Sequence, residues 1–340
     1  MTDHTDNLQQ ALEGAVRRFL PGADVRNLKR LTGGANQQMW SLDAVTPDQS
    51  TGLILRQASD WNQGADETLA LNNEARLLIR AAEHGLPVPA VHYVLTPEDG
   101  LGVGYLMARV EGETLPQRIL REERYASARA RLARQCGEAL ARVHQLPVAD
   151  LAFLPRATAE EAVRTLYAEY QGYQEPRPVF ELAFRWLRDN QPALPATRTL
   201  VHGDFRNGNL MVDDDGLKAI LDWEMASVGD PMADLGWMCV NSWRFGQIDL
   251  PVGGFGRREE LFAGYREVAG VAPDPQRVRY WEIFGTLKWG VICQKMAASF
   301  VAGQDTSVER GAIGRRASEA EVDLLRELVP LAVANPEPKP

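Results

Sequence analysis

The stretch LVHGDFRNGNLMVDDDGLKAILDWEMASVGDPMADLG, residues 200–236, contains the pattern that decides the fold. Two apolar runs lie inside it, at residues 210–212 and 219–221, and the acidic segment 213–216 ends in Asp-Gly between them. Short apolar runs on either side of an Asp-Gly turn are typical of a β-hairpin. The sequence therefore predicts two short antiparallel strands in the middle of this stretch.

Three polar side chains stand at the outer ends of this hairpin. Asp204 and Asn209 precede its first strand, and Asp222 follows its second. We expect them to converge on one small volume, as a magnesium site with a nearby base requires. Each residue alone has an ordinary explanation, because Gly-Asp and Asp-Asp-Gly sequences form turns and an Asp after a strand can cap a helix. The joint order H-G-D-x-x-x-x-N, followed by a strand ending in Asp, matches a kinase catalytic loop.

The motifs of this stretch resemble those of the aminoglycoside phosphotransferase (phosphotransferase enzyme) family, which is similar in fold to the protein kinases. The matching motifs are His202-Gly203-Asp204 with Asn209, Ile220-Leu221-Asp222-Trp223-Glu224, Gly229-Asp230-Pro231 and Asp234-Leu235. Within the family, the chain most resembles the kinase-like domains found beside, or fused to, acyl-CoA dehydrogenases. The resemblance runs from about Leu28 to about Ala302. It implies an α+β bilobal fold, with a small antiparallel-sheet N-terminal lobe and a larger, mainly helical C-terminal lobe.

The resemblance also implies a role for each motif residue. Asp204 would be the catalytic residue that orients the acceptor hydroxyl and takes its proton, while Asn209 and Asp222 would hold Mg²⁺. His202 and Asp234 would support the geometry of the catalytic loop. ATP is the implied phosphoryl donor, and nothing in the sequence separates ATP from GTP.

Length and charge limit the classes of protein that the chain can belong to. With 340 residues it can form two lobes, which we place at residues 1–110 and 111–334, followed by a disordered tail at 335–340. The net charge of −9 argues against nucleic acid or a membrane surface as partner, since both require a basic face. The polar N-terminus and the absence of a long apolar run predict a cytoplasmic protein. The oligomeric state stays open.

A paired glycine lies between two predicted strands in the N-terminal lobe. Gly33 and Gly34 separate an alternating run at 25–31 from a second strand at 39–42. Backbone N–H groups of such a loop can cover nucleotide phosphates, although glycine pairs also mark ordinary hairpins. The order of elements along the chain favours the phosphate-covering loop, which differs from the G-x-G-x-x-G loop of protein kinases.

Arg56 and Glu74 are predicted to form the ion pair of a kinase N-terminal lobe. Arg56 ends a short apolar strand at 52–57, where protein kinases carry a lysine that grips the phosphates. Glu74 lies on the apolar stripe of a helix predicted from about residue 67 to 84, and an inward-facing acid requires a cation. The alternatives are a surface arginine at a strand end and a glutamate at the edge of the stripe.

The segment from Met107 to Gly112 resembles the connection between the two lobes of a kinase. Backbone groups around Met107 and Arg109 would receive the adenine base. Both residues are therefore included among the predicted nucleotide-binding residues, with Gly33 and Gly34.

These observations favour a magnesium-dependent kinase that phosphorylates a hydroxyl of a small metabolite. Acidic and basic residues are balanced in the second lobe: residues 156–198 contain six of each, and residues 257–295 contain five acidic and seven basic residues. That balance favours a neutral or anionic acceptor, such as a hydroxy acid or hydroxyacyl-CoA, over a polycation. An aminoglycoside phosphotransferase, a catalytically silent pseudokinase and a purely structural α+β protein are the alternatives.

Overall fold

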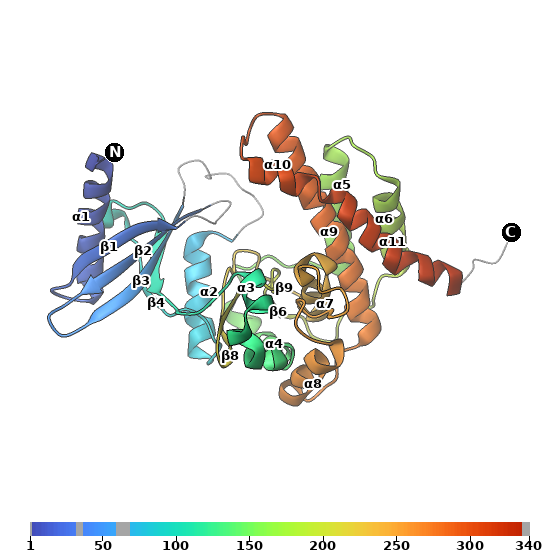
Figure 1. Cartoon of the computed structure of the whole chain (residues 1–340), viewed down its shortest axis with the longest axis horizontal. Coiled ribbons are helices and arrows are strands. Elements are labelled where there is room, and N and C mark those ends of the chain that lie inside the picture. Colours follow the sequence, from blue (N-terminus) through green and yellow to red (C-terminus); the bar gives the residue numbers. More distant parts are fainter. Residues whose placement is uncertain (1, 32–36, 59–68, 335–340) are drawn as a thin grey trace.

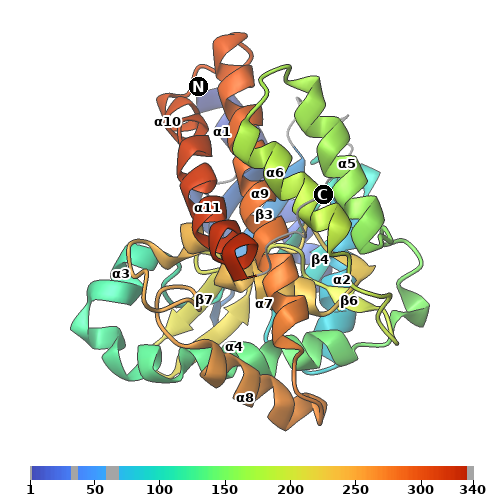
Figure 2. The ribbon, with the colours of Figure 1, turned by 90° about the vertical axis from the view of Figure 1, so that its right-hand side faces the viewer.

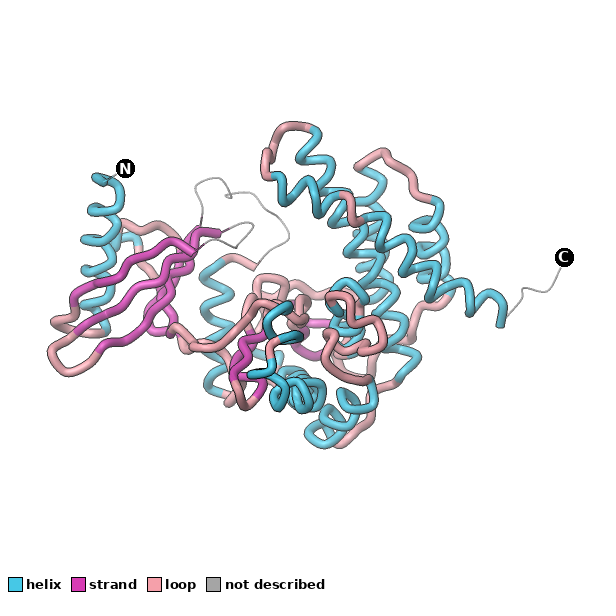
Figure 3. The backbone as a smooth tube through the Cα atoms, in the orientation of Figure 1, coloured by secondary structure: helices cyan, strands magenta, loops and turns pink. Residues whose placement is uncertain are grey.

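The structure is a computed structural model that describes residues 2–31, 37–58 and 69–334. Gly33, Gly34 and the tail 335–340 lie outside the described residues, and so do the first residues of the predicted helix at 67–84. Two parts are visible in Figure 1, a β-sheet with one covering helix near the N-terminus and a larger helical part toward the C-terminus. Strands gather mainly in the first part (Figure 3). The predicted α+β fold is thus confirmed.

A five-stranded antiparallel sheet forms the first part, with strand order β1-β2-β3-β5-β4. Its elements are α1 (Thr2–Phe19), β1 (Asp24–Leu31), β2 (Gln37–Val45), β3 (Ser50–Ala58), β4 (Val91–Val94) and β5 (Gly104–Ala108). Helix α1 covers one face and packs Leu12 and Val16 against Leu42, Leu53 and Leu55 of the sheet. Side chains alternate along a strand, so the residues next to this apolar set point to the other face.

Arg56 lies on that other face of β3, opposite Leu55 in the alternation. The strand pairings place Met39, Arg56 and Tyr105 at one level across β2, β3 and β5. Helix α2 (Leu71–Glu83) packs on the same side of the sheet and carries Glu74, which is fully buried. The predicted strand position of Arg56 and the inward position of Glu74 are therefore both observed.

The second part contains most of the helices. They are α3 (Pro116–Arg121), α4 (Ala126–Gln145), α5 (Ala159–Gly172), α6 (Pro178–Asp189), α7 (Met232–Cys239), α8 (Arg258–Ala269), α9 (Pro275–Val301), α10 (Val308–Gly314) and α11 (Ala317–Ala334). Four short strands lie among them: β6 (Thr199–Val201), β7 (Leu210–Asp213), β8 (Gly216–Ile220) and β9 (Ser227–Gly229). Strands β7 and β8 form the predicted hairpin, with Leu210 opposite Ile220.

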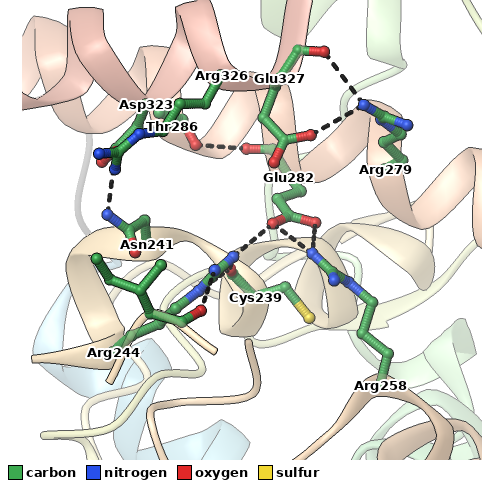
Figure 4. Close-up of polar contacts among 11 residues, drawn as sticks. Cys239, Asn241, Arg244, Arg258, Arg279, Glu282, Thr286, Asp323, Arg326 and Glu327 are labelled. Atoms are coloured by element: carbon green, nitrogen blue, oxygen red, sulfur yellow. Dashed lines mark hydrogen bonds and ion pairs between the residues drawn. The ribbon is translucent and has the colours of Figure 1, made fainter. Parts of the chain in front are cut away.

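Helix α9 runs through the helical part, and Figure 2 shows α5, α6, α10 and α11 grouped around it. A buried glutamate anchors this helix to the segments before it. Glu282 lies 2.9 Å from Arg244, which precedes α8, and 2.7 Å from Arg258, the first residue of α8 (Figure 4). Burial opposes the ionised form and raises the pKa of Glu282, although both guanidinium groups act against that rise. The ion pairs fix the position of α9 against the segment that follows α7.

No helix within the described ranges is both long enough and apolar enough to span a bilayer.

Candidate active site

The β7–β8 hairpin brings the predicted catalytic and metal residues together. Leu221 donates its backbone N–H to the carbonyl of Asn209 at 2.9 Å, which joins the two ends of the hairpin. The side-chain nitrogen of Asn209 donates to the carboxylate of Asp204 at 2.6 Å and to its carbonyl at 3.0 Å. Asp222 follows directly after Leu221 and adopts a left-handed backbone with φ of 64°. A positive φ at a non-glycine residue is uncommon and is a feature of functional sites.

The loop that carries Asp204 is held by a buried carboxylate on α7. Asp234 accepts hydrogen bonds from the backbone N–H groups of His202, at 2.8 Å, and Gly203, at 2.9 Å. His144 of α4 contacts the same carboxylate at 3.1 Å. Burial opposes ionisation of Asp234, but the hydrogen bond and charge of His144, together with His202, outweigh it and lower the pKa of the carboxyl. Asp234 thus supports the loop, which is the role that the family resemblance implies.

Gly203 and His202 complete this support. Gly203 has φ of 82°, and a Cβ atom on it would lie 2.3 Å from the carbonyl oxygen of Met225, so the loop requires glycine there. His202 is fully buried, and burial lowers its pKa. In the neutral form it donates from Nε2 to the carbonyl of Leu221 at 3.1 Å and accepts at Nδ1 from the N–H of Asp204 at 3.2 Å. The histidine therefore connects the loop to the second strand of the hairpin.

Two residues that the sequence analysis did not select hold the Asp204 carboxylate. Trp237 of α7 donates its indole N–H to Oδ1 at 2.8 Å. Arg206 donates from Nε to Oδ1 at 3.1 Å and to Oδ2 at 3.3 Å. One signal for Trp237 was present, because it lies one helical turn after Asp234 and so shares its face of the helix. Arg206 follows Asp204 by two residues inside the motif.

Arg56 and Glu74 form the predicted ion pair. Their side chains approach to 3.2 Å, and Arg56 also lies 2.8 Å from Asp222 and 3.5 Å from Glu224. Gln37 of β2 accepts from Nε of the same guanidinium. Burial raises the pKa of Glu74 to about 7 in spite of Arg56, and it raises that of Glu224 to about 7 as well, where Asp222 adds to the rise. One buried cation thus joins α2, the sheet and the end of the hairpin.

A cavity of about 250 Å³ lies between the sheet and the hairpin. Arg56, Glu74, Asn209 and Asp222 line its polar end. Its apolar walls come from the sheet, from α2 and the segment after it, and from the hairpin: Met39, Leu78, Pro89, Met107 and Ile220. Polar groups at one end and apolar walls elsewhere suit a nucleotide with its phosphates toward Arg56.

The two residues predicted at the connection between the lobes differ in position. Met107 lines the cavity. The side chain of Arg109 instead pairs with Asp43 at 2.8 Å and with Glu111 at 3.2 Å, and its backbone N–H donates to the carbonyl of Gly52 at 2.9 Å. Arg109 is absent from the described lining of this cavity. The nucleotide-binding roles of both residues stay predictions.

The residues present fit a magnesium ion bound together with nucleotide phosphates. The nitrogen of the Asn209 amide is engaged by Asp204, which leaves its oxygen as the atom that can bind a cation. Asp222 adds a carboxylate at the edge of the same cavity. Within the described residues no group of three or more His, Cys, Asp or Glu side chains forms a cage for a metal ion. Magnesium does not need one, because one or two protein ligands plus phosphates and water satisfy it.

A second cavity, of about 720 Å³, also borders the catalytic loop, at Gly203. Gly203, Glu224 and Trp237 line the end nearest to Asp204. The remaining walls are mostly apolar and come from the segment before α5, from α5 itself and from α9: Phe153, Leu154, Leu166, Trp281, Phe284 and Ile292. Glu224 lines both cavities, so the two cavities adjoin at this residue.

Comparison with known proteins identifies the family of the chain. The model of the phosphotransferase enzyme family matches residues 27–271, so the chain belongs to that family. The chain is 25% identical over 263 residues to mouse acyl-CoA dehydrogenase family member 10, a match that covers 70% of this chain and 24% of the relative. The chain therefore spans about a quarter of the length of that relative.

Solved structures share the fold over nearly their whole length. A Ralstonia eutropha protein provisionally named an aminoglycoside phosphotransferase superposes with a TM-score of 0.72 at 21% identity, covering 94% of this chain and 98% of its own. A choline/ethanolamine kinase family protein from Mesorhizobium loti superposes with a TM-score of 0.59 at 18% identity. The match covers 98% of this chain and 100% of that protein. The kinase-like bilobal fold is thus confirmed, and the protein is a small-molecule phosphotransferase by family.

Proposed function

We propose that this protein transfers the γ-phosphoryl group of ATP to a hydroxyl of a small metabolite in a magnesium-dependent reaction. One observation supports this most: the Asp204 carboxylate is hydrogen-bonded both to Asn209, which lines the 250 Å³ cavity with Asp222, and to Trp237, which lines the 720 Å³ cavity. A phosphoryl transfer needs a donor and an acceptor on opposite sides of such a carboxylate. The complete set of Asp204, Asn209 and Asp222 favours an active enzyme over a silent relative.

Each part of the site has a defined task in this proposal. Asp204 orients the acceptor hydroxyl and accepts its proton as the O–P bond forms. Asn209 and Asp222 would hold Mg²⁺, which shields the charge of the β- and γ-phosphates. Arg56 binds the same phosphates and is oriented by Glu74. The supports on Asp234 and His202 keep Asp204 in place, which lowers the cost of aligning the reactants.

The second cavity favours a neutral or anionic acceptor over a polycation. Three of its carboxylates lie near cations: Asp230 contacts Arg277 at 2.5 Å, Glu224 lies 3.5 Å from Arg56, and Glu169 lies 3.6 Å from Lys295. A polycationic antibiotic requires surplus acid, whereas these acids are largely neutralised.

A hydroxy acid or hydroxyacyl-CoA fits the mostly apolar walls and the balance of charge. The name of the mouse relative, an acyl-CoA dehydrogenase family member, is consistent with an acyl-CoA-derived acceptor.

A nucleotide-consumption screen of the purified protein tests this proposal. ADP formation is measured with Mg-ATP and, in separate reactions, hydroxy acids, hydroxyacyl-CoAs, sugars, amino alcohols and aminoglycosides. We expect acceptor-dependent ADP formation in the first two groups, lost when EDTA removes the metal. Turnover with aminoglycosides alone would support an antibiotic phosphotransferase instead. Magnesium-dependent nucleotide binding without any transfer would identify a pseudokinase.

A further inference from the structure

Trp237 contacts both the catalytic carboxylate and the second cavity. Its indole N–H donates to Oδ1 of Asp204 at 2.8 Å, and its ring lines the 720 Å³ cavity. The side chain is buried, with 7% of its surface exposed. A hydrogen bond to a charged carboxylate in such an environment is among the stronger ones in proteins.

The position of this indole is fixed from several sides. Trp243 packs against it with a centroid separation of 5.2 Å, and the Lys288 ammonium lies 5.0 Å from its ring centroid. Gly285 of α9 lets the ring approach the helix, because a Cβ there would lie 3.0 Å from an indole carbon and 2.8 Å from a Val240 methyl group. The ring therefore has little room to shift, and its N–H points at Asp204 in a defined direction.

The hydrogen bonds of Asp204 show which side chain holds each of its two oxygens. Trp237 and the nearer contact of Arg206 both fall on Oδ1. Asn209 donates to Oδ2, and Arg206 reaches that oxygen only at 3.3 Å. Each oxygen therefore accepts one short hydrogen bond, Oδ1 from Trp237 and Oδ2 from Asn209, and both share the longer contacts of Arg206. The Trp237 N–H is the short contact that comes from the wall of the second cavity.

We infer that Trp237 is a positioning residue that orients the Asp204 carboxylate and at the same time forms the wall of the acceptor cavity beside it. The inference rests on the proposed phosphoryl transfer. The N–H of Trp237 restricts rotation of the carboxylate and so holds it in one orientation toward the acceptor hydroxyl. The ring face limits how close a bulky group can lie next to that hydroxyl, which makes Trp237 a determinant of acceptor shape as well.

The substitution Trp237→Phe separates these roles from simple packing, because it removes the N–H and keeps an aromatic ring. Phosphate release from Mg-ATP without any acceptor provides a readout, since water then replaces the acceptor at Asp204. We expect kcat for phosphate release to fall by about tenfold or more, with KM for ATP within about twofold of wild type. The same fall in kcat should accompany transfer to any acceptor found in the screen.

Trp289→Phe is the matched control. Trp289 is also buried, packs on Trp243 at 4.9 Å, and its indole nitrogen has no hydrogen-bond partner among the described residues. The Trp289→Phe substitution should leave kcat for phosphate release and KM for ATP unchanged. Gly285→Ala is a second test, because the added methyl group displaces the indole while leaving its N–H intact; kcat should again fall.

Phosphate release by Trp237→Phe equal to that of wild type would overturn the inference, and so would an equal fall in Trp289→Phe. A fall in transfer alone, with phosphate release unchanged, would also overturn the orienting role. A wild-type protein that neither releases phosphate nor phosphorylates any acceptor would instead refute the proposed function itself.

Discussion

Replacing Arg56 by methionine should destabilise the protein in a pH-dependent way. Arg56 is 7% exposed and lies within 3.5 Å of three carboxylates, those of Glu74, Asp222 and Glu224. Methionine fills the space of the arginine stem but leaves the acids without their cation. Removing one partner of a buried ion pair costs about 3–5 kcal/mol, and Glu74, at 1% side-chain exposure, accounts for most of this cost.

The pH dependence follows from the raised pKa values of the two glutamates. The pKa values of Glu74 and Glu224 are about 7 in the folded protein, against an ordinary value of 4.5. Between pH 4.5 and pH 7 the folded state therefore binds more protons than the unfolded chain. Stability then falls as pH rises, by ~1.4 kcal/mol per pH unit for each extra proton bound. Without Arg56 the folded pKa values of Glu74 and Glu224 rise further. The free energy of unfolding of the variant therefore keeps falling to higher pH. Its loss of stability relative to wild type should be larger at pH 8 than at pH 6.

Urea unfolding at pH 6, 7 and 8 measures this effect. Arg109→Met is the control, because Arg109 directly follows β5 of the same sheet but pairs with Asp43 and the exposed Glu111 near the surface. The Arg109→Met substitution should lower the free energy of unfolding by about 0–1 kcal/mol. A cost for Arg56→Met that is the same at pH 6 and pH 8, or no larger than the cost for Arg109→Met, would refute this account of the buried cluster.

Two other substitutions test the nucleotide site and the packing of α9. Asp222→Ala should lose magnesium-dependent ATP binding, because it removes the main predicted metal ligand; calorimetry with an unchanged Mg-ATP affinity would count against that role. Glu282→Gln should destabilise the protein by about 3–5 kcal/mol, because it leaves the buried Arg244 without its anion. Glu319→Gln, in the surface pair with Arg316 at the start of α11, should change stability by less than about 0.5 kcal/mol. An equal loss of stability in Glu282→Gln and Glu319→Gln would contradict the assignment of Glu282.

Much of the fold follows from local signals in the sequence. The Asp-Gly turn and the apolar runs on either side of it predict the β7–β8 hairpin, and the observed pairing of Leu210 with Ile220 follows the same pattern. Glu74 was predicted to face inward because of its spacing from Leu71 and Leu78, and it is fully buried. Such features depend on residues close in sequence, which is why periodicity detects them.

The parts that the sequence did not predict depend on contacts between distant segments. Trp237 reaches Asp204 because α7 packs against the catalytic loop. Its spacing from Asp234 places both on one face of α7, but that spacing does not indicate the contact with Asp204. Glu224 joins the Arg56 cluster across 168 positions of the chain. Arg109 shows the opposite case: its position in sequence suggests the nucleotide, whereas its side chain is engaged by Asp43.

Asp204→Asn tests the central claim most directly. The substitution keeps the size of the side chain but removes the carboxylate that would accept the proton of the acceptor hydroxyl. With an acceptor identified in the screen, phosphorus NMR follows formation of the phosphorylated product, and calorimetry follows Mg-ATP binding. We predict that product formation falls by about 10³-fold or more while Mg-ATP affinity stays within a few-fold of wild type. A variant that retains most of the wild-type turnover would contradict the assignment of Asp204 and, with it, the mechanism proposed for this site.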